Sequence, residues 1–291
     1  MKKKILFIIL IIPLMLTLTG CENTSDSKTM NVITSVYPIE YILDNLYGQQ
    51  VTSESIYPPG TYYNDYKLTN EQIKKYANET DLFIYNGNIE KEKDYAVKLL
   101  NINKKIKLID ATQGMNYTNS ISEAWLNPSN LLMMSSNIKK GLEEYINENI
   151  ETKKINKNYS QLKLKLSQID AELKMVSNNS KSNTIVVNND CFKYLEKYGF
   201  NVISLEENDN LTDKTLSELK ERINNKEINY IFLKDEDEEN ETIKNLKEQY
   251  DLKIQSLNSL STLTSKQRID KKDYMSIMLD NINSIKLEVT E

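Results

Sequence analysis

The chain has no histidine among its 291 residues, and it is poor in the residues that interrupt regular structure, with seven glycines and five prolines. Without histidine, neither a Ser-His-Asp triad nor a hydrolase with a histidine-bound metal can be built. The sequence also contains no P-loop and no GxGxxG stretch. No spacing points to a Ser/Lys or carboxylate enzyme. We therefore predict that the protein is not an enzyme.

Cysteine is almost as scarce, and one of the two cysteines lies in a recognisable N-terminal pattern. Three lysines precede an apolar stretch at 5–18, which is too short for a membrane span of about 20 residues. The sequence Leu18-Thr19-Gly20-Cys21 looks like a bacterial lipobox. It predicts a lipoprotein signal peptide at 1–20 and diacylglycerol on Cys21, which would anchor the chain at the extracytoplasmic face of a cell membrane. An uncleaved signal anchor is the alternative.

Little else in the bulk composition is unusual. Residues 21–30 are polar and indicate a lipidated, flexible tether. If Cys21 is lipidated, Cys191 is a lone thiol and no disulfide framework is possible; a buried packing role is typical of such a residue, and metal ligation is the alternative. The net charge of −5 argues against a nucleic acid partner. About 260 residues remain, enough for two lobes with their own cores.

Strand-like and helix-like segments alternate in both halves of the chain. Expected strands in the first half are 31–36, 51–57, 82–85 and 106–109. Helices are expected at 39–46 and, after the capping-box spacing of Thr69 and Gln72, up to residue 77. In the second half, strands are expected at 184–187, 201–205, 228–233 and 253–257, with helices at 192–198, 216–223, 241–250 and 271–285. Such alternation indicates parallel sheets wrapped by helices.

A long helical region separates these halves. Pro128 opens one helix that continues to about 146, and a second runs from about 152 to 176 without glycine or proline. A helix of about 25 residues is nearly 38 Å long, which suits a strut between lobes; a surface helix or a coiled-coil seam is the alternative. We predict an α/β monomer with lobes at 31–150 and 179–291, joined by one long rigid α-helix at 151–178.

Several short motifs then suggest a family. They are VITSVYP at 32–38, PPGTYYNDY at 58–66, LFIYNG at 82–87, EAWLNP at 123–128, NNDCFKY at 188–194 and LNSL at 257–260. In their order and spacing, the chain resembles the zinc- and manganese-binding solute-binding lipoproteins of ABC importers, over essentially the whole mature chain. The resemblance implies transport of a metal ion held in the cleft between the lobes, and an ABC permease as partner.

The resemblance also implies a ligand set, in which this chain departs from the family. The family's four metal-binding positions, which carry two histidines, a histidine or glutamate, and an aspartate, fall on Asn64, Glu123, Asn189 and Asn258. This chain therefore has one carboxylate and three amides at these positions. Zinc prefers imidazole and thiolate, and amides are poor ligands for it. We therefore expect that any divalent metal, zinc or manganese by resemblance, binds weakly.

Further residues near these positions are candidates for a supporting role. Asp65 and Asp190 are adjacent to two of them and could add carboxylates, although an Asp commonly caps its own backbone instead. Tyr63 and Trp125 flank two others, and tyrosine can line a small-molecule site or simply pack. The acidic run at 235–239 is expected to be a solvated helix-terminal face, with weak cation collection as the alternative.

Two other functions remain open at this stage. A family fold without its ligands could be a degenerate, non-metal-binding surface protein, such as an adhesin or interaction module. The amides and tyrosines could instead line a pocket for a polar organic solute.

Overall fold

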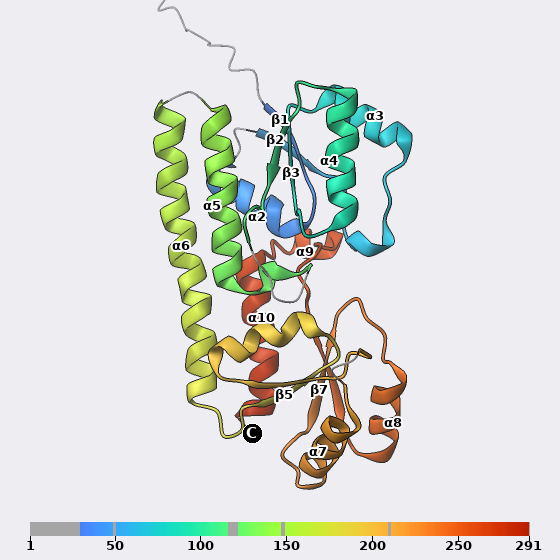
Figure 1. Ribbon diagram of the computed structural model, residues 1–291. Helices are drawn as coiled ribbons and strands as arrows, with labels where there is room; N and C mark the ends of the chain where they lie inside the picture. The colour runs from blue at the N-terminus through green and yellow to red at the C-terminus, as the bar shows by residue number, and fades with distance from the viewer. Residues whose placement is uncertain (1–29, 49–50, 116–121, 147–148, 209–210, 291) are drawn as a thin grey trace, which may run out of the picture.

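Each half of the chain builds a four-stranded parallel sheet, and the two sheets have the same strand order. The sheets belong to two separate lobes (Figure 1). The computed structural model describes residues 30–48, 51–115, 122–146, 149–208 and 211–290. The predicted signal peptide and the Cys21 anchor lie outside these residues. Met30, predicted to belong to the tether, is the first residue of a strand.

The first sheet has the order β2-β1-β3-β4. Its strands are β1 (Met30–Thr34), β2 (Val51–Ser55), β3 (Leu82–Tyr85) and β4 (Lys107–Asp110). Its helical segments are α2 (Tyr37–Leu46), the short 3-10 helix η2 (Tyr63–Asp65), α3 (Asn70–Glu79) and α4 (Glu90–Ile102). The predicted capping box forms, since Thr69 and Gln72 bond reciprocally at the start of α3.

Helix α4 was not predicted from the sequence. Its buried residues Glu92, Tyr95, Ala96 and Leu99 have helical spacing, but one of them is charged. All of the first five residues of α4 are charged. The apolar periodicity is therefore too weak to show in the sequence.

The second sheet repeats the arrangement in the order β6-β5-β7-β8. Its strands are β5 (Thr184–Val187), β6 (Asn201–Ser204), β7 (Tyr230–Lys234) and β8 (Lys253–Leu257). They are accompanied by η4 (Asp190–Tyr198), α7 (Asp213–Asn224) and α8 (Glu241–Gln249). The helix predicted at 192–198 exists as the 3-10 helix η4, which ends at Gly199 with a positive φ of 99°.

A 30-residue helix links the two lobes, as predicted. This helix, α6 (Asn149–Asn178), is about 45 Å long at 1.5 Å per residue. It packs against α2 and α5 (Pro128–Tyr145) at one end and against η4 and α10 (Tyr274–Val289) at the other. The predicted fold class, two parallel α/β lobes joined by a long helix, is confirmed.

The chain also crosses back to the first lobe after β8, which was not foreseen. The Tyr37 amide donates to the Ser261 carbonyl at 3.1 Å, and the Gly60 amide donates to the Leu263 carbonyl at 2.9 Å. Helix α9 (Ser265–Ile269) then lies close to the first sheet in Figure 1. One hydrophobic cluster is continuous through both lobes, so the lobes are packed together rather than loosely tethered. The lobe bounds themselves stay predictions.

Candidate functional site between the lobes

In both sheets the strand order reverses between the two central strands. In an open parallel sheet, that point at the carboxyl ends of the strands is where ligands usually bind. In the second sheet the central strands are β5 and β7, and the residues at their ends are Asn188 and Lys234. Of these two, Lys234 meets a side chain from the first lobe, Glu123. The geometry therefore places a candidate site between the lobes.

Glu123 is at the centre of this site. It precedes the short 3-10 helix η3 (Ala124–Leu126), and its side chain is 8% exposed. Its Oε1 atom accepts a hydrogen bond from the Tyr63 hydroxyl at 2.8 Å and contacts Lys234 Nζ at 2.7 Å. Burial and the nearby Glu123 carboxylate raise the pKa of Tyr63 above its usual value, so its hydroxyl stays protonated and donates. One carboxylate oxygen is thus bonded from both lobes.

Lys234 is the residue that sequence reasoning missed. It is the last residue of β7, its side chain is 5% exposed, and it forms a second ion pair with Glu236. Its backbone amide donates to Asn188 Oδ1 at 2.7 Å, which fixes the end of the strand. Burial alone would lower the pKa of Lys234, but Glu123 and Glu236 outweigh that effect and raise it, so the side chain is an ammonium.

Trp125 forms the apolar wall of the site. It is fully buried, its ring meets the Tyr63 ring edge-on, and its Nε1 donates to the Ser259 carbonyl at 2.8 Å. The Tyr274 hydroxyl of α10 donates to the Trp125 carbonyl at 2.7 Å. Trp125 therefore joins the first lobe to the segment that follows β8.

The predicted first ligand position is not in the site. Asn64 and Asp65 are exposed, whereas their neighbour Tyr63 is buried against Glu123. Successive residues of a 3-10 helix point about 120° apart, so only one residue of η2 can point toward Glu123. That residue is the tyrosine.

The predicted amide positions, Asn189 and Asn258, are partly buried but already bonded. Asn189 Oδ1 caps the Cys191 amide at 3.0 Å, and its Nδ2 donates to Asp237 at 3.1 Å. Asn258 Oδ1 accepts from the Leu260 amide, and its Nδ2 donates to Asp235 at 2.6 Å. Both side-chain amide oxygens thus accept hydrogen bonds from backbone amides, and both side-chain NH2 groups donate to aspartates of the segment after β7.

Asp190 also has other partners. Its Oδ2 pairs with Lys193 at 2.8 Å, within η4. Cys191, next to it, is a free buried cysteine, and burial raises the pKa of its thiol well above the ordinary value. A thiol that stays protonated is a packed side chain and not a ready metal ligand, as expected from the sequence.

The prediction that the acidic run at 235–239 is a solvated face was wrong for its first three residues. Asp235 accepts the Ser259 amide at 2.8 Å, Glu236 pairs with Lys234, and Asp237 accepts from Asn188 at 2.9 Å. The signal in the sequence was a lysine at the end of a buried strand, directly before the acids.

While the Lys234 ammonium is in place, the Oε1 atom of Glu123 is not free to bind a divalent ion. No group of three or more Cys, Asp or Glu side chains that could hold a metal ion occurs within the described ranges. Oε1 of Glu123, which a metal ligand would place about 2.0–2.2 Å from the ion, already binds the Lys234 ammonium and the Tyr63 hydroxyl.

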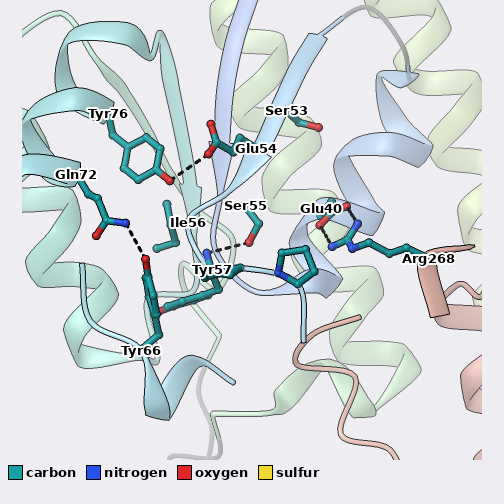
Figure 2. Close-up of a pocket in the computed structure, with 12 residues that line it drawn as sticks. Glu40, Ser53, Glu54, Ser55, Ile56, Tyr57, Tyr66, Gln72, Tyr76 and Arg268 are labelled. Atoms are coloured by element: carbon teal, nitrogen blue, oxygen red, sulfur yellow. Dashed lines mark hydrogen bonds and ion pairs between the residues drawn. The ribbon is translucent and has the colours of Figure 1, made fainter. Parts of the chain in front are cut away.

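A separate pocket of about 480 Å³ lies beside the carboxyl end of β2, in the first lobe (Figure 2). On one side Arg268 bonds both carboxylate oxygens of Glu40, at 2.6 and 2.9 Å. On the other, Gln72 donates to the Tyr66 hydroxyl at 2.7 Å. This pocket has a mixed polar and apolar lining, and Glu123 does not line it.

Two parallel lobes with a site between them define a two-lobed solute-binding protein. A family model described as zinc-uptake complex component A, periplasmic (ZnuA), matches residues 32–287. The chain therefore belongs to the ZnuA family of metal-type solute-binding proteins of ABC importers. This is a family of transport proteins, so the prediction that the chain is not an enzyme is confirmed.

Curated relatives agree with this assignment. The manganese ABC transporter substrate-binding lipoprotein PsaA of Streptococcus pneumoniae is 30% identical over 211 residues, 67% of each chain. The iron-binding protein YfeA of Yersinia pestis is 30% identical over 63% of this chain and 62% of its own. The zinc-binding protein AdcA of Streptococcus pyogenes is 24% identical over 99% of this chain, which spans 62% of AdcA.

Solved structures confirm the fold. The zinc-bound ZnuA-like domain of Streptococcus pneumoniae AdcA superposes with a TM-score of 0.72 at 22% identity, covering 90% of this chain and all of that domain. The metal-dependent lipoprotein YcdH of Bacillus subtilis gives 0.74 at 17% identity, again over 90% of this chain and all of its own. Among the described helices, none combines the length and the apolar character needed to cross a membrane.

Proposed function

We propose that this protein is the membrane-anchored receptor of an ABC importer, and that it holds a divalent metal ion between its lobes at Glu123. The observation that carries the proposal is the position of Glu123. Its buried carboxylate lies where the lobes meet and is bonded by Tyr63 from one lobe and Lys234 from the other. Membership of a metal-transport family supports a cation as the cargo.

Zinc and manganese are the cargo ions that the relatives suggest. PsaA is named for manganese and AdcA for zinc, and both kinds of relative match this chain. PsaA is also named as an ABC transporter component, which supports a permease as the partner. PsaA and a pneumococcal AdcA are named as lipoproteins, which supports the predicted diacylglycerol anchor on Cys21.

The affinity of the site for either ion is low in this proposal. The carboxylate of Glu123 and the hydroxyl of Tyr63 are the donors that face each other, and Asn189 and Asn258 are engaged elsewhere. Oxygen donors of this kind suit hard cations such as manganese better than zinc. One carboxylate gives far less binding energy than a site of several charged ligands.

Calorimetric titration of zinc and manganese into the metal-stripped full chain in detergent tests the proposal. We expect one-to-one binding weaker than about micromolar that disappears in Glu123→Ala, because this removes the only ligand candidate bonded from both lobes. Asn64→Ala is the matched control and should bind as the wild type does, since Asn64 is exposed. Loss of binding in Asn64→Ala, or no binding by the wild type at millimolar metal, would contradict the proposal.

A second candidate is a degenerate member that acts as a surface adhesin or binds a polar organic solute. The ion pair between Lys234 and Glu123 favours it, because this pair already neutralises the carboxylate. The pocket beside β2, lined by both polar and apolar side chains, offers a place for an organic ligand (Figure 2). A wild-type protein that binds no metal but is thermally stabilised by a metabolite would support this candidate.

A further inference from the structure

The interlobe site contains a positive charge of its own. The Lys234 ammonium lies between a carboxylate from the first lobe, Glu123, and a carboxylate from its own lobe, Glu236. All three side chains are less than a tenth exposed. The ammonium is thus a cation bound by carboxylate oxygens from both lobes, which is the role that a bound metal ion would have at this position.

The two carboxylates depend on this ammonium. Glu236 Oε1 is buried and has no hydrogen-bond partner apart from its ion pair with Lys234. If the ammonium were removed, two carboxylates would face each other in a poorly solvated space, and each would need a new counter-charge. A divalent metal ion is such a counter-charge.

We propose that Lys234 is a built-in cation, which occupies the interlobe site in place of a divalent metal and links the lobes when no metal is present. The inference rests on the proposed function and deepens it, since Lys234 becomes the residue that sets the low metal affinity. A metal ion can bind Oε1 of Glu123 only after the Lys234 ammonium, 2.7 Å from that atom, moves away. A site that is open in only a fraction of molecules has an apparent Kd weakened by that fraction.

Several other contacts join the lobes away from Glu123, and one of them, between Tyr62 and Asp235, involves a carboxylate. Trp125 and Ser259 are joined by a neutral hydrogen bond, and so are Gly60 and Leu263. The Arg268–Glu40 ion pair also joins the two parts of the chain, but its arginine is 34% exposed, and it lines the separate pocket in Figure 2. Lys234 is thus the ammonium that acts at Glu123 itself.

The test compares the wild type with Lys234→Met, which keeps a long side chain and removes the charge. Manganese chloride and zinc chloride are titrated into the metal-stripped full chain in detergent, and Kd and Tm are measured. We expect Lys234→Met to bind at least about tenfold more tightly than the wild type, because both carboxylates become available. Its metal-free Tm should be lower than that of the wild type, and metal should recover part of the loss.

Two controls separate charge from packing. Lys234→Arg keeps a cation and should gain no metal affinity. Lys139→Met removes a lysine that is also poorly exposed, at 18%, but whose partner Glu143 lies on the same helix, so it should bind metal as the wild type does.

The wild type alone supplies an independent arm if Lys234→Met fails to fold. Its Tm should be the same in EDTA and in buffer, because the ammonium and not a metal links the lobes. A Tm that falls in EDTA would overturn the inference, and so would a folded Lys234→Met that binds metal no better than the wild type. If Lys234→Met shows no gain in affinity but the wild type binds metal and Glu123→Ala does not, the inference fails and the proposed function stands. If neither protein binds metal, the proposed function fails as well.

Discussion

Glu92 and Glu123 are two buried carboxylates of the first lobe, and the protein stabilises them in different ways. Glu92, on α4, is fully buried and accepts from the Tyr57 hydroxyl at 3.0 Å and from the Asn86 amide at 2.8 Å. Burial raises its pKa to about 7, against the lowering effect of these neutral donors. Glu123 is instead paired with an ammonium from the other lobe.

The difference shows what each group does for the fold. The hydrogen bonds of Glu92 come from its own lobe, so this carboxylate stabilises that lobe alone. Because burial raises its pKa, it can bind a proton near neutral pH. Glu123 depends on a charge that arrives only when the lobes are together. Its ion pair is therefore a link between lobes, in a site where the family assignment leads one to expect a metal ion.

The largest expected effect comes from breaking that ion pair from both sides. We expect Lys234→Met and Glu123→Gln to be coupled in a double-mutant cycle by about 2 kcal/mol, because each single change leaves a buried group without its partner. The free energy of unfolding in urea is measured for the wild type, both single variants and the double variant.

The Lys139–Glu143 pair on α5 is the matched comparison, because it joins successive turns of one helix. Its coupling energy should be about 0.5 kcal/mol. A coupling between Lys234 and Glu123 no larger than this value would mean that the pair contributes nothing special to holding the lobes.

A smaller effect should appear at Glu92 and depend on pH. Its pKa is raised from 4.5 to about 7 in the folded state, so folding favours the protonated form. That stabilisation is complete below about pH 4.5 and is lost as the pH rises through 7. We expect the free energy of unfolding of Glu92→Gln, relative to that of the wild type, to be roughly 2 kcal/mol higher at pH 8 than at pH 5, measured by urea unfolding.

Glu71→Gln is the control for this pH series, because Glu71 is exposed and its substitution removes no buried carboxylate. Its difference from the wild type should be small and similar at both pH values. If Glu92→Gln behaves in the same way, Glu92 is not the buried, proton-binding carboxylate described here.

Most of the fold could be predicted from the sequence because the strands are short apolar runs bounded by turns. The predicted strands 82–85, 184–187 and 253–257 match β3, β5 and β8 residue for residue. The crossing of residues 258–269 to the first lobe could not be predicted. It depends on backbone hydrogen bonds, such as that from Gly60 to Leu263, between residues some 200 positions apart, which leave no local pattern.

The site was harder to predict than the fold, because it depends on which way side chains point. The motif position suggested Asn64, but the turn of η2 presents Tyr63 to Glu123 instead. Lys234 was overlooked because a lysine at the end of a strand is normally taken as a solvent-exposed boundary. Only the approach of the first lobe buries it.

The most direct test of the central claim is the distance between the lobes with and without metal. Spin labels at Lys104→Cys and Lys220→Cys, both exposed positions, report this distance in a Cys21→Ala background, while the buried Cys191 escapes labelling. For the wild type, we expect the same narrow distance distribution in EDTA and in saturating manganese. For Lys234→Met, we expect a longer or broader distribution in EDTA. A wild-type protein whose lobes separate in EDTA would contradict the central claim, because a metal ion and not Lys234 would then hold them together.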